Sequence, residues 1–271
     1  MFDLKNFPVT TELSSIAGVE LSSLLTQAQQ IQTDAFNLPD GILGKLTIDP
    51  IVLAAQIKQA TQKPVIAHLT CRDSTRLGLA SRLLGAASLG IDAILALSGD
   101  AGPKNVFEIR TPGLVKLIKE LQTGYFDKQK LKSTPRLQIG VAVNPNVANQ
   151  IDYLKRKVQA GADFVQTQPV FSLAVAEKFL ANIQKAKIKI PILFGVMPLK
   201  NATLAKYFNQ NVTGVQIPPQ VLERLENEPE AGLKITLELL EKIHNKLAGV
   251  HIMPLGQIQT ANKIYQFLKN Q

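Results

Sequence analysis

The chain is poor in the residues that form cross-links and stacking surfaces. Its 271 residues include no tryptophan, a single cysteine (Cys71) and only 6% aromatic residues. One cysteine excludes an internal disulfide framework and a cysteine-rich metal site, and it fits a reducing, cytoplasmic location. So few aromatic side chains leave little surface for stacking the bases of single-stranded nucleic acid. We therefore expect no nucleic-acid partner.

Long apolar runs are also missing. No stretch of 18 apolar residues occurs, and residues 1–13 lack the basic and apolar segments of a signal peptide. We expect neither a membrane span nor a leader. The formal net charge of +9 can attract nucleic acid, anionic lipid or phosphorylated small molecules. However, the lysines are spread along the chain without a block of five or six, which is more typical of solvated helix surfaces.

The sequence does contain a regular alternation of short apolar segments and amphipathic ones. We predict eight strands, at 8–13, 34–38, 64–70, 93–99, 137–144, 163–169, 191–198 and 250–255. A helix is predicted after each of them, at 20–32, 50–61, 75–90, 111–121, 149–161, 173–186, 201–211 and 260–269. One or two extra helices fill residues 218–248, before the last strand.

This alternation predicts the fold class. Continuous apolar strands are typical of a parallel sheet that helices cover, and eight such units suit an α/β fold of the closed (β/α)₈ TIM-barrel type. No linker rich in proline, glycine or serine divides the chain, so we expect a single domain over residues 1–271. An open doubly wound sheet is the alternative, because it also alternates strands and helices.

In a barrel of this kind, catalytic groups lie at the C-terminal ends of the strands. The residues that close the predicted strands carry carboxylates, amides, one imidazole and one guanidinium, among them Glu12, Asn37, Pro39, Asp40, His68, Arg72, Ser98, Asp100, Asn144, Gln166 and Gln168. They show no metal-ligand spacing, and we expect no metal. The chain also lacks the dinucleotide, P-loop and nucleophile-elbow motifs. Such a rim favours a flat heterocycle rich in hydrogen-bonding groups over a phosphoryl group.

Several of these residues have both a chemical and a structural interpretation. If Glu12 were buried among apolar neighbours, its pKa would rise and it could donate a proton; otherwise it is an exposed residue or a lysine partner. His68 either contacts a ligand or is a buried core histidine. Cys71 is most simply a small buried residue. The amide of Gln168 can pair with a heterocycle or satisfy loop backbone. The basic residues at 154–157 form a solvated helix face or bind a pyrophosphate.

Four segments together resemble one enzyme family. These are "AHLTCRDSTRLGLASRLLGAASLGIDAILALSGD" (67–100), "NPNVANQIDYLKRKVQAGADFVQTQPVF" (144–171), "GVMPLKNATLAKYF" (195–208) and "GVHIMPL" (249–255). In this order they are similar to the methylenetetrahydrofolate reductase family, especially to the form fused to homocysteine methyltransferases. The resemblance implies a (β/α)₈ barrel that binds FAD at its C-terminal face. It implies a hydride passed from NADH or NADPH to the flavin and then to 5,10-methylenetetrahydrofolate, which becomes 5-methyltetrahydrofolate.

The resemblance also assigns roles to individual positions. It implies that Glu12 protonates the folate N10, and that Asp100 lies near the flavin and pterin, where it stabilises the cationic iminium. It implies that Gln168 contacts the pterin or nicotinamide. The positions that match flavin contacts are His68, Ser98, Gly99, Asp100, Asn144, Arg156 and Lys157, with the basic pair near the pyrophosphate.

The chain also departs from the family at four single residues. Ser98 replaces a common arginine, Leu204 a folate-contacting glutamine, and Pro39 a threonine, while Gln257 lies near an arginine that contacts folate. Two alternatives to the reductase therefore stay open. One is an enzyme acting on another pterin or one-carbon substrate. The other is a barrel that binds folate or flavin without turnover, as a subunit that needs a partner protein. We also expect a homo-oligomer.

Overall fold

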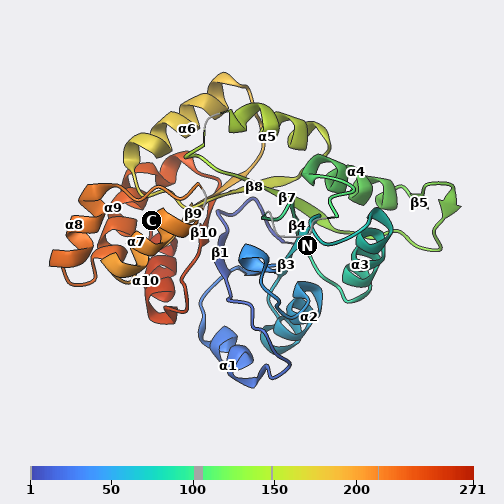
Figure 1. Ribbon diagram of the computed structural model, residues 1–271, viewed down its shortest axis with the longest axis horizontal. Helices are drawn as coiled ribbons and strands as arrows, with labels where there is room; N and C mark the ends of the chain where they lie inside the picture. The colour runs from blue at the N-terminus through green and yellow to red at the C-terminus, as the bar shows by residue number, and fades with distance from the viewer. Residues whose placement is uncertain (1, 101–105, 148, 213) are drawn as a thin grey trace.

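Eight parallel strands form a closed barrel in the computed structural model, which describes residues 2–100, 106–147, 149–212 and 214–271. The order around the ring is β1-β10-β9-β8-β7-β4-β3-β2 (Figure 1). The strands are β1 (Val9–Glu12), β2 (Ala35–Leu38), β3 (Val65–Thr70), β4 (Ala93–Leu97), β7 (Gln138–Val143), β8 (Phe164–Thr167), β9 (Ile192–Val196) and β10 (Gly249–Ile252). All eight predicted strands are confirmed, and the open doubly wound alternative is wrong because β1 pairs with β10.

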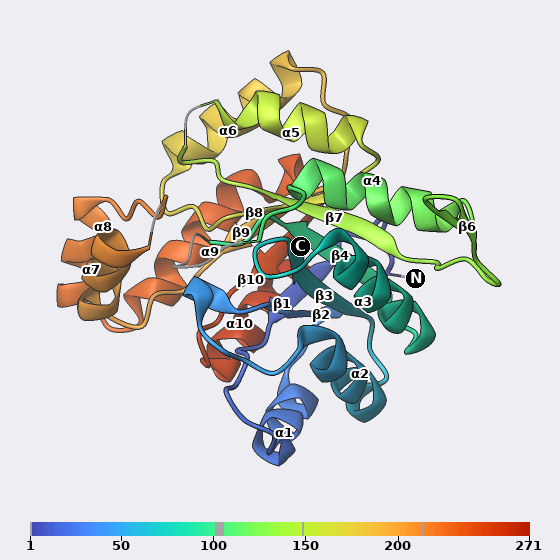
Figure 2. The ribbon, with the colours of Figure 1, turned by 45° about the vertical axis from the view of Figure 1, so that its right-hand side comes forward.

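Helices surround this ring of strands (Figures 1 and 2). They are α1 (Ser22–Gln30), α2 (Pro50–Thr61), α3 (Arg76–Ser88), α4 (Thr111–Gln122), α5 (Gln150–Gln159), α6 (Leu173–Lys185), α7 (Ala202–Asn211), α8 (Pro219–Asn227), α9 (Ala231–Ile243) and α10 (Ile258–Lys269). The extra helices expected within 218–248 are α8 and α9. No helix in the described parts of the chain is long and apolar enough to cross a membrane.

Local sequence signals explain where several helices begin. Asp49 precedes α2 and accepts hydrogen bonds from the backbone of Ile51 and Val52, and Pro50 occupies the first helical position, where its missing N–H costs nothing. Thr75 caps α3 and Asn201 caps α7 in the same way. These helices begin close to the C-terminal ends of β3 and β9, so capping also fixes the loops at the mouth of the barrel.

The sequence did not lead us to expect a two-stranded hairpin after α4. Its strands are β5 (Tyr125–Phe126) and β6 (Gln129–Lys130), and it projects from one side of the molecule (Figure 1). Arg76 of α3 fixes it, because its guanidinium pairs with Asp127 at 2.8 Å and lies over the ring of Phe126. Two residues per strand are too few for a clear alternating pattern.

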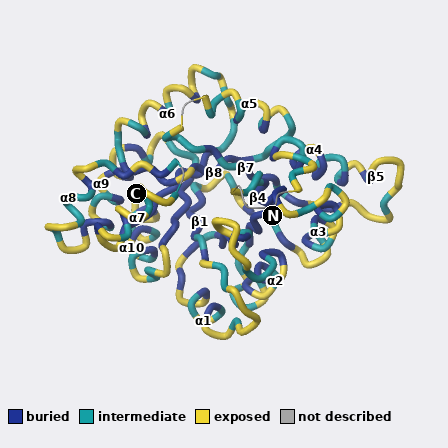
Figure 3. Tube along the Cα trace, in the orientation of Figure 1, coloured by how far each residue is buried: buried dark blue, intermediate teal, exposed yellow. Residues whose placement is uncertain are grey.

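The inside of the barrel is apolar at its N-terminal end. Phe2, Ile66, Leu95, Phe164 and Leu193 form one buried cluster there, and the rings of Phe2 and Phe164 meet edge to face at 5.9 Å. The strands and the inner helix faces are likewise buried, whereas the outer helix faces are exposed (Figure 3). A packed lower half leaves chemistry to the C-terminal half of the barrel.

Gly140 of β7 makes this packing possible. A Cβ at this position would collide with the ring of Phe164 and would lie 2.9 Å from Cδ1 of Leu95. We predict that Gly140→Ala lowers the free energy of unfolding by about 1–3 kcal/mol through overpacking, measured by urea denaturation. Gly85→Ala is the matched control: nothing lies within 4 Å of its Cβ, and it should stabilise α3. Equal stability of the two variants would contradict this account.

Candidate functional site

A layer of buried polar side chains crosses the barrel above its apolar half. It consists of Asn37 on β2, His68 on β3 and Gln166 on β8. Oδ1 of Asn37 lies 3.0 Å from Nε2 of Gln166 and 3.2 Å from Nε2 of His68. Since β2 and β8 lie halfway round the ring from each other in either direction, the Asn37–Gln166 hydrogen bond passes across the barrel axis. This layer forms the floor of the mouth.

The polar layer is only partly satisfied. Nδ2 of Asn37 and Oε1 of Gln166 are buried without a hydrogen-bond partner. Turning both amides over would exchange the donor and the acceptor, yet one atom of each would still be left over. Buried polar groups are normally paired, so each exception calls for an explanation. Unpaired amide atoms of this kind fit a floor that serves a ligand with hydrogen-bonding edges.

Burial keeps His68 neutral. It lowers the pKa of the imidazole to about 4, while the nearby Glu12 carboxylate acts in the opposite direction and His251 adds to the lowering. The hydrogen bond to Asn37 then requires the proton to be on Nε2 of His68. The interpretation of His68 as a buried histidine is confirmed, and its contact with a ligand stays a prediction.

Glu12 ends β1 beside a histidine that sequence reasoning missed. Its Oε2 lies 3.8 Å from Nε2 of His251, and Nδ1 of His251 lies 3.0 Å from the hydroxyl of Thr10. The Glu12 side chain is 20% exposed, so it lies between the fully buried and the exposed interpretation, and its neighbour is a histidine and not a lysine. His251 lies in an apolar run, and the alternation of β10, which points its side chain inward like that of Thr10, is the signal that could have revealed it.

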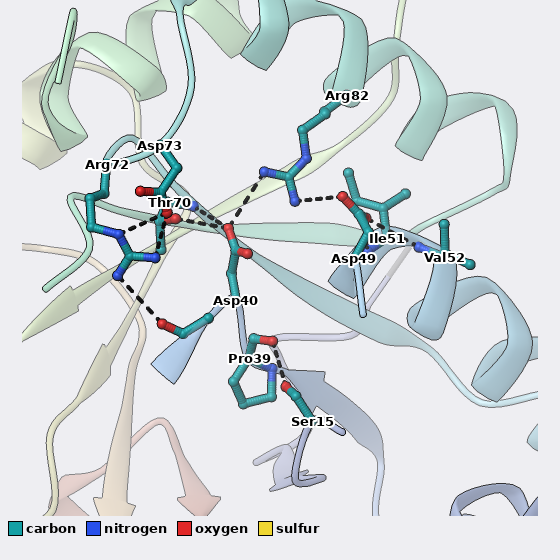
Figure 4. A network of polar contacts seen from close by, with 11 residues as sticks. Ser15, Pro39, Asp40, Asp49, Ile51, Val52, Thr70, Arg72, Asp73 and Arg82 are labelled. Atoms are coloured by element: carbon teal, nitrogen blue, oxygen red, sulfur yellow. Dashed lines mark hydrogen bonds and ion pairs between the residues drawn. The ribbon is translucent and has the colours of Figure 1, made fainter. Parts of the chain in front are cut away.

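A network of carboxylates and guanidinium groups braces the rim after β2 and β3 (Figure 4). Asp40 accepts hydrogen bonds from both the backbone N–H and the hydroxyl of Thr70, each at 2.9 Å. Arg82 of α3 lies 3.5 Å from Asp40 and 2.8 Å from Asp49. Arg72 binds Asp73 through two nitrogens. Asp40, which the sequence placed at the rim, therefore has a structural role here.

The segment after β4 brings three predicted site residues to the same rim. The hydroxyl of Ser98 is held 2.9 Å from that of Thr111, in the first turn of α4. Gly99 has a φ of +87°, and a Cβ there would lie 2.9 Å from Cβ of Arg72, so a side chain does not fit. Asp100 is exposed, and its Oδ2 accepts a hydrogen bond from the backbone of Leu43 at 3.1 Å.

The remaining predicted residues are distributed over β7, β8 and α5. Asn144 bridges its own loop and the carbonyl of Gly214, 3.0 Å away. Gln168 is exposed at the end of β8. Lys157 is buried, with Nζ 2.6 Å from the carbonyl oxygen of Ala142, and burial lowers its pKa to about 8. Arg156 is exposed on the same helix, so the basic pair differs in burial although both cations lie over the ring of Tyr153.

Cys71 and the positions that depart from the family have local partners. Cys71 is fully buried and burial raises the pKa of its thiol to about 11, which confirms it as a packing residue. Leu204 lies in the first turn of α7, capped by Asn201. The carbonyl of Pro39 accepts from the Ser15 hydroxyl at 2.7 Å. The amide of Gln257 donates to the carbonyls of Pro198 and Pro254.

A hollow of about 530 Å³ lies elsewhere, lined by α6 residues and by Ile188, Ile190 and Ile192 at the start of β9. The start of a barrel strand is opposite to the end that carries Glu12 and Asp100, so this hollow is not part of the site. The described residues hold no group of three His, Cys, Asp or Glu side chains suited to a metal ion.

The neutral state of His68 predicts how stability depends on pH. Below a pH of about 6.5 the unfolded chain protonates this histidine, whereas the folded chain resists protonation until about pH 4. The free energy of unfolding should therefore fall by about 3 kcal/mol as the pH drops through this window, as measured by urea denaturation from pH 7 to pH 4. His68→Gln should flatten that slope, and the control His244→Gln should not. An unchanged slope in His68→Gln would contradict the prediction.

Comparison of the chain with known proteins identifies its family. A family model described as methylenetetrahydrofolate reductase matches residues 17–269. A "Probable methylenetetrahydrofolate reductase (NADPH)" of Caenorhabditis elegans is 28% identical over 72% of the chain, and "Methylenetetrahydrofolate reductase 2" of Schizosaccharomyces pombe is 27% identical over 99%. The chain spans only 30% and 45% of these two proteins.

A solved structure supports the fold. It is described as an uncharacterized protein from Clostridium thermocellum that binds two copies of 5-methyl-5,6,7,8-tetrahydrofolic acid. It matches with a TM-score of 0.70 and 15% identity, covering 97% of this chain and 96% of that one. The match of the family model over nearly the whole chain shows that the protein belongs to the methylenetetrahydrofolate reductase family.

Proposed function

We propose that the protein reduces 5,10-methylenetetrahydrofolate to 5-methyltetrahydrofolate, with NAD(P)H as the electron donor and FAD as the cofactor. The observation that carries this proposal is the half-buried Glu12 above a polar floor at the C-terminal end of the barrel, next to His251. Membership of the family and the folate named for the Clostridium protein support it.

The described residues fit a flavin on two observations. The unpaired atoms of Asn37 and Gln166 suit a heterocycle whose edge carries both donors and acceptors. Lys157 has a buried ammonium whose partners in the described part of the chain are a carbonyl and the ring of Tyr153, so no carboxylate neutralises it. Such a cation is suited to the pyrophosphate of FAD. FAD would supply the two-electron chemistry that links NAD(P)H to the folate.

In this proposal Glu12 is the general acid. Its carboxyl protonates N10 of the folate, which opens the five-membered ring and leaves a cationic iminium on N5. His251 faces Glu12 at 3.8 Å and is itself held by Thr10, so the proposed acid has an oriented imidazole beside it. His68 stays neutral at physiological pH, and it therefore adds no positive charge where the iminium forms.

Asp100 stabilises that cation electrostatically. Its carboxylate is exposed at the rim and held by the backbone of Leu43, which orients an oxygen without neutralising its charge. Gln168 ends β8 with an exposed amide that can bind the pterin or the nicotinamide. Gly99 allows a flat ring to approach the backbone closely.

One observation favours a second candidate, a relative that acts on another pterin or one-carbon substrate. Gln257 lies where a folate contact was expected, yet its amide donates to the carbonyls of Pro198 and Pro254. Ser98 is similarly engaged with Thr111. Two of the positions at which the chain departs from the family are therefore engaged in internal contacts.

Two half-reactions, followed separately, test the proposed function. The protein loaded with FAD should show a flavin absorbance band at about 450 nm. This band should disappear anaerobically with NADH or NADPH, and it should return when 5,10-methylenetetrahydrofolate is added. Failure to regain the band, while another reduced-pterin substrate restores it, would favour the second candidate. Bleaching by dithionite but by neither pyridine nucleotide would indicate that a partner protein supplies the electrons.

We predict that Glu12→Gln separates these steps. The variant should bind FAD and be reduced by NAD(P)H as the wild type is, because neither step needs the acid. Its reoxidation by the folate should be about 10²–10⁴-fold slower, as measured by stopped-flow absorbance. Glu177→Gln, an exposed change on α6, is the matched control and should leave both steps intact. Normal folate turnover by Glu12→Gln would overturn the acid assignment.

A further inference from the structure

Arg72 lies buried at the point where three loops of the rim meet. It follows β3 and is 5% exposed, and its guanidinium binds Asp73 through Nε and Nη2 (Figure 4). Its Nη1 also lies 3.4 Å from the carbonyl oxygen of Gly41, after β2, and 3.4 Å from that of Asp100, after β4. One side chain thus links the segments that follow β2, β3 and β4.

The backbone and Cβ of Arg72 hold the segment after β4 as well. Its carbonyl accepts a hydrogen bond from the N–H of Val106 at 2.8 Å, so Arg72 contacts residues on both sides of 101–105. Gly99 also passes close to the Arg72 side chain, where a Cβ on Gly99 would be 2.9 Å from Cβ of Arg72. The path of the chain into Asp100 therefore depends on the position of Arg72.

Arg72, Asp100 and the segment from Gly41 to Leu43 each contact the other two. Arg72 binds the carbonyls of Gly41 and Asp100, and the carboxylate of Asp100 in turn accepts from the backbone N–H of Leu43. Gly41 and Leu43 have φ values of +51° and +53°, a conformation that is unfavourable for leucine. The surrounding contacts must hold that conformation in place, and in the described part of the chain the backbone N–H of Leu43 is held by the carboxylate of Asp100.

We propose that Arg72 is a positioning residue that sets the place and orientation of Asp100 at the mouth of the barrel. This inference rests on the proposed function, in which Asp100 stabilises a developing cation. Arg72 does not act on the substrate itself, because it is buried and its donors are engaged. A guanidinium suits the task, since its planar fork reaches several acceptors at once and stays charged among Asp40, Asp73 and Asp100.

Arg72→Lys tests the role because it keeps the charge and removes the fork. The first readout is amide hydrogen exchange, which needs no substrate. We expect Arg72→Lys to speed exchange at both Leu43 and Val106 by about tenfold or more, and Asp100→Ala, which removes the acceptor of the Leu43 N–H, to speed it at Leu43 alone. Unchanged protection of Leu43 in Arg72→Lys would overturn the proposal.

The second readout is a double-mutant cycle on the reoxidation of reduced enzyme by folate. Arg72→Lys should slow this step by about 10- to 100-fold, and adding Arg72→Lys to Asp100→Asn should slow it no further, because both changes remove the same oriented carboxylate. Independent, multiplying effects would overturn the proposal, since they would mean that Arg72 acts other than through Asp100.

The matched control is Arg76→Lys, which alters an arginine bound to Glu120 and Asp127 outside the mouth. It should change neither exchange at Leu43 nor the folate step. If wild-type protein fails to reduce the folate, the proposed function fails, but the exchange experiment still decides whether Arg72 holds Leu43 and Asp100 together. The two failures are therefore distinguishable.

Discussion

The hydrogen bonds that meet at Oδ1 of Asn37 are the constraint on which the rest of the site depends. A closed eight-stranded barrel has an interior that side chains must fill, and here the filling changes from apolar to polar at this level. Below it, aromatic and aliphatic side chains exclude water. Above it, a floor with unpaired amide atoms faces the residues proposed for proton transfer. Burial of the unpaired amide atoms in the floor costs free energy of folding. The same burial lowers the pKa of His68 and keeps it neutral.

The carboxylates at the rim fall into those that brace loops and one, Asp100, that is proposed to act on the substrate. Asp40, Asp49 and Asp73 lie against guanidinium groups and hold loops and a helix start in place. Asp100 instead shows its carboxylate to solvent while its backbone is held from beneath. If every rim carboxylate were paired with a guanidinium, the loops would be rigid but no negative charge would be left to act on a ligand. If none were paired, the loops would not be held in place.

The sequence was sufficient for what depends on local patterns. Continuous apolar runs and amphipathic segments located the strands and helices to within a few residues, and the strand ends located Glu12, His68 and Asp100. The site features that the sequence did not predict depend on contacts between segments far apart in the chain. His251 is 241 residues from its partner Thr10, and the link between Asn37 and Gln166 appears only once β2 and β8 face each other. The different burial of Arg156 and Lys157 depends on helix rotation, which a run of basic residues does not specify.

Closure of the ring between β1 and β10 affects how the barrel folds during synthesis. Val9 pairs with Val250, so the first strand to leave the ribosome waits for the last before its edge is covered. Until then the nascent chain exposes two open strand edges, and Glu12 has no histidine beside it. Contacts of such long sequence separation slow folding. The surroundings of the proposed acid are therefore completed last, and a chain interrupted before β10 would hold most of a barrel without His251 beside Glu12.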